Sequence, residues 1–266
     1  MVTARRLPDF ESPPINEVAL GVRFRPVPGL TATHFGLYWS QIKDQFGRCE
    51  HAAPIAPVEG TTDAATGLPL PRVWLIHNDE EFLIQLQPNL FFLNWRKTDG
   101  QRKYPRYATV KPEFERQLFR YFDFLNSIGL ARPEPNNCEL TYVNIIPKGQ
   151  GWDSNADIRN IWPDIVWRGS SERFLRAPKA LNFRVSFDLP QNAGELIITL
   201  QNASRKTDNE PALRLELSAR GDLPTPSTKA MDDWFELAHE WIVRGFADAT
   251  DRGVQDKFWK RLNDAG

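Results

Sequence analysis

The amino-acid sequence predicts an α+β protein in which one order of elements occurs twice: strand, helix, three strands, long helix. Three observations support this prediction. Segments with alternating apolar residues are short and closely spaced, as in antiparallel hairpins. Two long segments, at about residues 111–128 and 227–246, carry an apolar stripe with helical period. The apolar segment 137–147, just past the middle of the chain, starts the order again.

The first half is expected to cover residues 14–132, after an N-terminal arm at residues 1–13. Residues 47–71 are rich in Pro, Gly, Ala and Thr and have no period, which predicts a long loop, and loops of this length are usually functional or mobile. The expected elements are a strand at 15–24, a helix at 34–46 capped by Thr33, strands at 72–77, 81–87 and 90–96, and a helix from about residue 111 that stops at Gly129.

The second half is expected to cover residues 133–266. Its last three strands alternate cleanly between apolar and polar residues, which is typical of an antiparallel sheet with one wet face. The expected elements are strands at 137–147, 181–189, 194–202 and 212–219, a weak helix at 154–162, a long helix from about residue 227 and a short tail helix at 255–262.

The two halves share the order of their elements and the character of their opening strands. Two such halves can join edge to edge as a curved antiparallel sheet backed by helices, like the saddle of the TATA-binding protein. That comparison is an analogy of fold and carries no function. The alternative is one irregular α+β domain without duplication.

Composition sets the broad class of the protein. The chain has 266 residues, a hydrophobic share of 41% and a formal net charge of −1, which argues against a protein that coats nucleic acid through bulk positive charge. Two cysteines, Cys49 and Cys138, do not suggest a disulfide framework. No signal-peptide core and no membrane-length apolar run is present, so we expect a cytoplasmic protein.

Motifs that carry catalysis or cofactor binding are missing from the sequence. It contains no phosphate-binding loop, no dinucleotide-binding glycine turn and no nucleophile elbow. His239 and Glu240 begin like a zinc-protease helix, but Val243 stands where the second histidine is required. We therefore expect no metal and no cofactor. His34 opens the first helix and is interpreted as a residue near the helix cap, with a general base as the less favoured alternative.

One segment, residues 94–107, concentrates basic and aromatic residues. Such a mixture suits contact with phosphate, base stacking or a protein hot spot. The alternative is a solvated hairpin end, and for Trp95 and Tyr107 we favour packing under the second long helix. The candidate binding residues in this segment are Arg96, Lys97, Arg102, Lys103, Tyr104 and Arg106.

A second candidate surface is the polar face of the predicted sheet. Arg and Gln side chains alternate with apolar ones along several strands, so they would share one face if the halves pair as proposed. Such a face can bind a partner, although an ordinary solvated face is more common. The candidate residues on it are Arg23, Gln85, Gln87, Arg184, Gln201 and Arg214.

Several segments together resemble a sporadically distributed bacterial protein family with no established activity. The resemblance spans nearly the whole chain, and it implies an accessory role, such as a toxin–antitoxin, immunity or phage-defence component. The matching segments are PINEV at 14–18, HFGLYW at 34–39, NWRK at 94–97, YPRY at 104–107, CELTYVN at 138–144 and HEWIVRGF at 239–246.

The favoured hypothesis is a non-enzymatic protein that binds a protein partner, with the sheet face and segment 94–107 as its surfaces. The alternative is a nucleic-acid or nucleotide-binding protein that uses segment 94–107. An enzyme with His34, Glu17 or Glu139 as acid or base ranks last. The sequence does not identify the partner, the ligand or the oligomeric state.

Overall fold

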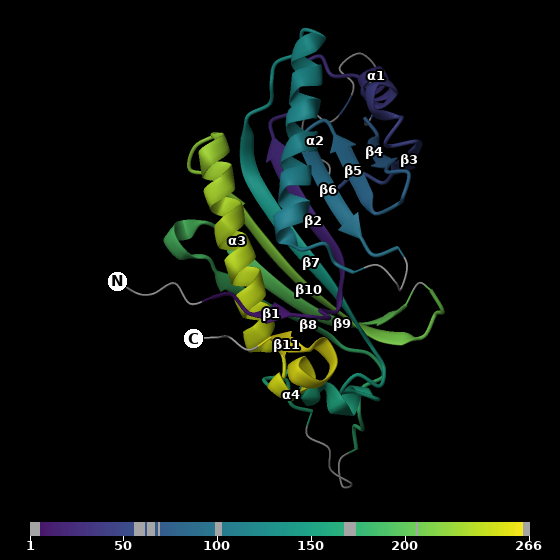
Figure 1. Cartoon of the computed structure of the whole chain (residues 1–266), viewed down its shortest axis with the longest axis vertical. Helices are drawn as coiled ribbons and strands as arrows, with labels where there is room; N and C mark the ends of the chain where they lie inside the picture. The colour runs from purple at the N-terminus through teal and green to yellow at the C-terminus, as the bar shows by residue number, and fades with distance from the viewer. Residues whose placement is uncertain are drawn as a thin grey trace. The chain divides into compact units, whose positions relative to one another are not determined.

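A computed structural model describes residues 6–55, 62, 67–68, 70–98, 103–167, 174–205 and 207–262. The described strands form a nine-stranded antiparallel sheet, in the order β3-β4-β5-β6-β2-β7-β10-β9-β8, and a small sheet of β1 and β11. Figure 1 shows the elements by label. The α+β class expected from the sequence is therefore confirmed.

The strands are β1 (Asp9–Phe10), β2 (Ile15–Phe24), β3 (Arg48–Ala52), β4 (Arg72–Ile76), β5 (Phe82–Gln87), β6 (Leu90–Arg96), β7 (Pro135–Pro147), β8 (Asn182–Asp188), β9 (Glu195–Ser204), β10 (Pro211–Asp222) and β11 (Arg261–Leu262). The helices are α1 (Ala32–Ile42), α2 (Tyr107–Ser127), α3 (Thr228–Ala249) and α4 (Arg252–Val254). Short helical turns are η1 (Asn155–Asn160), η2 (Pro190–Asn192) and the π-helical η3 (Gln255–Trp259).

Packing divides the chain into two compact units. Unit 1 consists of Met1–Asn16, Thr141–Ala219 and Glu236–Gly266, and unit 2 consists of Glu17–Leu140 and Arg220–Phe235. Each unit has its own buried aromatic and aliphatic side chains.

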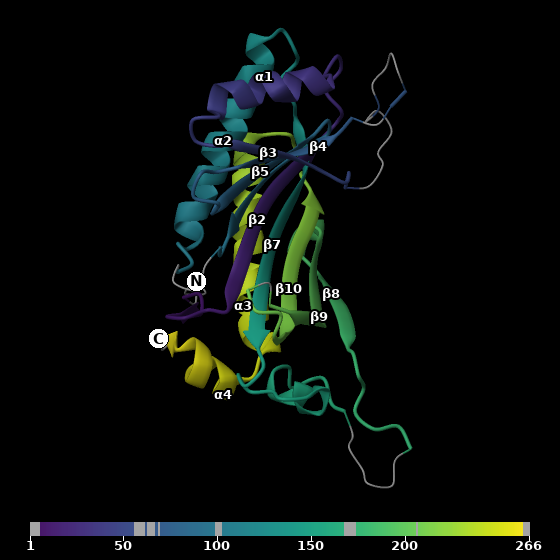
Figure 2. The same cartoon turned by 90° about the vertical axis from the view of Figure 1, so that its right-hand side faces the viewer.

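In unit 2, helix α2 packs on one face of β6 and β2, and α1 lies beside it (Figure 2). The amphipathic pattern of α2 explains this, because its apolar stripe turns toward the sheet. The ring of Phe91 on β6 lies 6.1 Å from that of Phe114 and stacks on Tyr121 at 5.8 Å. Trp95, four residues after Phe91 on β6 and on the same face, is fully buried. Tyr38 joins α1 to α2 through an edge contact with Tyr121 at 5.1 Å.

The hydroxyl groups of Tyr38 and Tyr121 lie in this core without a hydrogen-bond partner among the described residues. Burial raises the pKa of both phenols above the usual value. An unpaired buried hydroxyl costs free energy, so Tyr121→Phe is expected to raise the free energy of unfolding by about 1 kcal/mol. Urea unfolding of the variant measures this. A clear loss of stability instead would mean that the hydroxyl has a partner, such as an ordered water.

In unit 1, the C-terminal part of α3 packs on β9 and β10. Gly245 allows this close approach, because a Cβ there would lie 3.0 Å from a methyl group of Leu196 and 3.9 Å from one of Leu217. Phe246 lies at the same end of α3 and contacts Phe10 of β1 at 5.4 Å and Trp259 at 5.0 Å. The N-terminal β1 and the C-terminal segment are thus held against one helix.

Several expected boundaries are confirmed and others are wrong. The strand at 15–24 and the hairpin strand at 90–96 match β2 and β6, and the turn after α2 uses Gly129 at φ +80° as expected. The loop 47–71 is wrong in part, because its start forms β3. The arm 1–13 also contains a strand, β1, which pairs with β11.

Helix starts were the least accurate expectation. The first helix begins at Ala32 after the N-cap Thr31, not after Thr33, because His34 at N3 closes a capping box with Thr31. The second begins at Tyr107, earlier than residue 111, and includes Pro112 in its second turn. The weak helix at 154–162 is a 3₁₀ turn, η1, and the expected tail helix is α4 followed by η3.

Candidate functional site

Strand register in unit 2 gathers polar side chains on the sheet face opposite α2. Trp74 is paired with Gln85, Gln85 with Phe92, and Phe92 with Gly21, so these four positions share that face. Phe91 and Trp95, at the alternate positions of β6, point toward α2. We call this surface the polar face; it comprises Glu17, Arg23, Arg72, Trp74, Gln85, Gln87, Asn94 and Arg96.

A chain of hydrogen bonds crosses four strands of the polar face. The indole Nε1 of Trp74 donates to Oε1 of Gln85 at 3.2 Å, and Nε2 of Gln85 donates to Oδ1 of Asn94 at 2.7 Å. Nδ2 of Asn94 then donates to Oε1 of Glu17 at 2.5 Å. Every donor in the chain points toward the Glu17 carboxylate, so the bonds reinforce one another.

A second charged cluster lies beside β2, where Glu139 sits between two arginines. Its Oε2 lies 3.5 Å from Nη2 of Arg23, and its Oε1 accepts a hydrogen bond from Nη2 of Arg220 at 3.2 Å. The Glu139 side chain is only 11% exposed. The guanidinium of Arg23 also lies over the ring of Phe92, 5.7 Å from its centroid. Two cations share one carboxylate, which leaves the cluster with a net positive charge.

Arg72 and Arg96 carry charge on the polar face with fewer partners. The Nε of each is buried and has no hydrogen-bond partner among the described residues. The Arg72 guanidinium lies 5.4 Å from the Trp74 ring centroid, and burial lowers the pKa of Arg72 from its usual value. Arg96 donates from Nη2 to the carbonyl oxygen of Glu80 at 3.3 Å. Both guanidinium groups have N–H donors that can bind a carboxylate or phosphate.

One end of the polar face is covered by the segment after β3. The backbone N–H of Ile55 donates to Oε1 of Gln87 at 3.0 Å, and Ile55 packs on the cluster of Ala19, Leu90 and Phe92. Gln87 is fully buried. Gln87 was predicted as a binding residue, but its side chain holds this segment in place and is not presented to a partner. Gln85 is also buried and acts through Asn94.

The candidate residues of segment 94–107 do not form one cluster. Arg96 lies on the polar face, and Lys97 follows it at the end of β6. Tyr104 packs on Trp95 with ring centroids 5.3 Å apart, and Trp95 is buried as expected. Tyr107 is also buried, but it is the first residue of α2 and does not lie under that helix. Lys103 is exposed, and Arg106 is the exposed N-cap of α2 with φ 77°. Arg102 lies outside the described residues.

The remaining predicted residues of the sheet face belong to unit 1. Arg184 pairs with Thr199 and Gln201 with Asn182, so both lie on the same face of the β8–β9 pair. Arg214 on β10 forms an ion pair with Glu216. On β9, Gln201 alternates with Leu196, Ile198 and Leu200, which are buried. Their alternation was visible in the sequence.

Three members of the polar face, Arg72, Trp74 and Asn94, were not among the binding residues expected from the sequence, whereas Arg96 was. Asn94 and Arg96 are two residues apart on one strand, and Arg72 and Trp74 are two residues apart on another. Because side chains two residues apart on a strand share a face, the sequence places each pair on one face. What the sequence lacked was the register between strands, which decides that these two pairs meet around Gln85. Arg220 is far away in the sequence and joins through Glu139.

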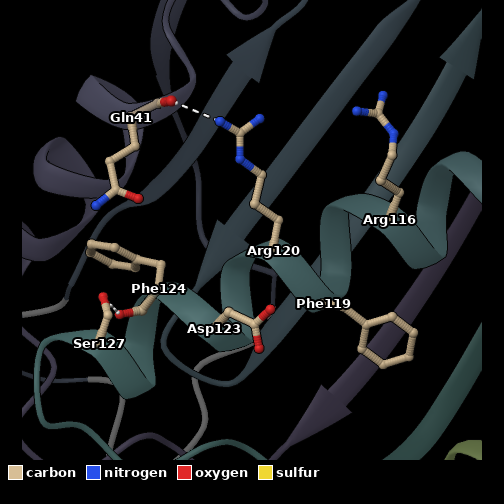
Figure 3. A pocket seen from close by; sticks show the side chains of 7 residues that line it. All are labelled: Gln41, Arg116, Phe119, Arg120, Asp123, Phe124 and Ser127. Carbon is tan, nitrogen blue, oxygen red and sulfur yellow. Dashed lines mark hydrogen bonds between the residues drawn. The ribbon is translucent and has the colours of Figure 1, made fainter.

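A shallow groove of about 560 Å³ lies between α1 and α2, and Figure 3 shows its lining. Three of its polar side chains bond within the protein. Nη2 of Arg120 donates to the carbonyl oxygen of Gln41 at 2.8 Å, and Arg116 forms a bidentate ion pair with Glu113. The Ser127 hydroxyl donates to the carbonyl oxygen of Phe124 at 2.7 Å. The Arg120 bond to Gln41 therefore helps to fix α1 on α2.

Residues considered for chemistry are occupied in structural roles. His34 accepts a hydrogen bond from the Thr31 N–H through Nδ1 at 3.0 Å, which confirms its place near the cap. Cys49 is exposed and Cys138 is buried, and burial raises the pKa of both thiols. Within the described residues, no cluster of His, Cys, Asp or Glu is suited to hold a metal ion.

Comparison with protein-family models gives no match, and no curated protein is significantly similar to the chain. Within the described part of the chain, no helix has both the length and the apolar character required to cross a membrane.

Proposed function

We propose that this protein binds a protein partner through the polar face of unit 2, and that the partner supplies carboxylate groups. Arg72 carries the proposal. Its guanidinium is partly buried against Trp74, its Nε has no hydrogen-bond partner, and it makes no ion pair among the described residues. An arginine in this state gains most from a carboxylate delivered by another molecule, because the pair then forms away from water.

Two further features support a carboxylate-bearing partner. Arg96, across the polar face, also has a buried Nε without a partner among the described residues. The Glu139 cluster adds a positive charge from two arginines against one carboxylate. Arg and Trp are also the residue types enriched at interface hot spots.

The hydrogen-bond chain through Gln85 and Asn94 gives this surface a fixed form. Both amides are buried and make bonds along the chain, so the side chains on either side of them are held in one arrangement. A preformed surface loses less conformational freedom when it binds. This favours recognition over catalysis, because Glu17 and Glu139 are each engaged by donors within the protein.

The proposal extends to the biological role of the protein and to the origin of its fold. An accessory, antitoxin or immunity role in a bacterial toxin–antitoxin or phage-defence locus is the setting that the family resemblance suggests, and the proposed compartment is the cytoplasm. Duplication of a β-α-β-β-β-α half is proposed for the origin of the fold. It is supported by the strand order β4-β5-β6-β2 followed by β7-β10-β9-β8, in which the opening strands β2 and β7 are neighbours and each half continues outward in reverse order.

Replacing Arg72 and Arg96 together by glutamine is expected to reduce partner recovery at least about tenfold, because each lost charge-assisted bond contributes on the order of 1–2 kcal/mol. The measurement is affinity purification of the tagged full chain from its host, followed by quantitative mass spectrometry. The matched control is Arg116→Gln with Lys229→Gln, which removes the same charge from exposed side chains of α2 and α3 within unit 2.

The partner must be retained by the control pair and lost with the polar-face pair. Equal recovery with both double variants would contradict the proposal. A nuclease-sensitive nucleic acid, bound with a steep dependence on salt and lost when Lys103 and Arg106 become Ala, would instead support the alternative of nucleic-acid binding through segment 94–107.

A further inference from the structure

The outer edge of strand β8 in unit 1 differs from the edge formed by β3. Both strands end the nine-stranded sheet, and β8 lies at its border in Figure 2. β3 is short, and Arg48 on it forms ion pairs with Glu50 and Glu80, which is the usual protection of an edge. β8 instead exposes apolar side chains: Val185 is 39% exposed and Phe187 is 49% exposed.

The backbone of β8 is prepared for another strand. The Leu189 N–H donates to the carbonyl oxygen of Gly194 at 2.8 Å, and the Leu181 carbonyl accepts from Asn202 at 3.3 Å. In an antiparallel pair, residues that bond to the neighbour alternate with residues whose groups point away from it. The odd-numbered residues of β8 therefore bond to β9. The N–H and C=O groups of Arg184, Ser186 and Asp188 point to the outer edge.

Side chains along this edge are self-complementary. Around a two-fold axis at Ser186, Arg184 stands opposite Asp188 of a second copy, and Asp188 stands opposite Arg184. On the other face, Val185 meets Phe187 of the second copy. Among the described residues, neither Arg184 nor Asp188 has an ion-pair partner within its own chain. Opposite charges and aromatic–branched pairs are the cross-strand combinations that stabilise a sheet.

We propose that β8 pairs antiparallel with β8 of a second copy of this chain, so that the protein forms a two-fold dimer through this edge. The register places Ser186 opposite Ser186 and uses only the outward-pointing backbone groups. Phe174 and Leu175, in the segment that precedes β8 in the sequence, are also exposed apolar residues, at 96% and 61%. Because a single strand pair buries a small area, we expect a weak, concentration-dependent dimer. This inference does not depend on the proposed function.

Charge reversal tests the register. Sedimentation analysis of the full chain over a wide concentration series is expected to show a monomer–dimer equilibrium. Arg184→Asp alone, or Asp188→Arg alone, places like charges opposite each other twice per dimer and should raise the Kd at least about tenfold. The double variant R184D/D188R reverses both charges together and should restore the Kd of the wild type. Circular dichroism shows whether each variant is folded.

A proline provides a second test that does not depend on charge. Ser186→Pro removes an N–H that points outward and leaves the bonds to β9 in place, as edge strands tolerate. The variant should be folded and monomeric. A protein that remains monomeric at every concentration would overturn the proposal. So would a dimer whose Kd is unchanged by both single reversals and by the proline.

Discussion

Replacing Gly21 by alanine is expected to lower the free energy of unfolding by about 2 kcal/mol. The reason is the ring of Phe92, the cross-strand partner of Gly21, which occupies the space where a side chain at position 21 would go. A Cβ at position 21 would lie 2.2 Å from Cε1 and 2.3 Å from Cδ1 of that ring, so the ring must move. It cannot move freely, because Phe92 is buried in a cluster with Ala19, Leu90 and Ile55.

A double-mutant cycle makes the cause of this loss testable. Phe92→Ala alone is expected to cost about 3 kcal/mol, because it leaves a cavity. In that background, Gly21→Ala should be neutral or stabilise by roughly 0.5 kcal/mol, since the clash is gone and alanine restricts the unfolded chain more than glycine does. The effect of one substitution thus changes sign with the residue at position 92.

The matched control for the cycle is Gly36→Ala. A Cβ at Gly36, on helix α1, would meet nothing within 4 Å. Alanine is the better helix former, so this variant should gain roughly 0.5–1 kcal/mol. Urea unfolding measures all five proteins. If Gly21→Ala costs the same with Phe92 present or absent, the ring is not the reason.

Acid is expected to weaken unit 1 through His239 on α3. The imidazole is largely shielded from water and its ring lies 6.2 Å from that of Tyr142. Burial lowers the pKa of His239 from 6.5 to about 4, and the charge of Glu240 opposes this only in part. The neutral form is therefore the one that the folded protein accommodates.

The sign of the effect follows from the direction of the shift. Because the unfolded chain takes up a proton near pH 6.5 and the folded chain only near pH 4, this contribution is complete above pH 6.5 and is lost as the pH falls to about 4. With allowance for partial solvent contact, the loss amounts to about 2 kcal/mol. His239→Gln should remove that part of the pH dependence between these limits.

The measurement is urea unfolding of wild type and His239→Gln at several pH values. The slopes of the unfolding free energy against pH are compared, so that any constant loss from the substitution cancels. An NMR titration of the histidine ring gives the pKa directly. A titration midpoint close to 6.5, or identical slopes for the two proteins, would contradict this prediction.

Much of the fold could be predicted from the sequence, because strand and helix periods are local properties of the chain. The alternation in β2 and the apolar stripe of α2 each identified an element, and the turn residues between the strands identified β5 and β6. The missed elements lacked such a pattern. β3 carries Arg48, Cys49, Glu50 and His51, and only its pairing with β4 makes it a strand. β1 has two residues and exists because β11 pairs with it.

The candidate site was likewise predicted only in part from the sequence. Strand period alone placed Arg23, Gln85 and Gln87 on polar sides of their strands. Only the tertiary structure decided that Gln87 is buried under Ile55, that Arg96 stands beside Glu17, and that Trp74, Gln85 and Asn94 form one hydrogen-bonded chain. The physical reason is that register and long-range pairing join residues distant in sequence, such as Glu17 and Asn94, and no local pattern encodes which strands become neighbours.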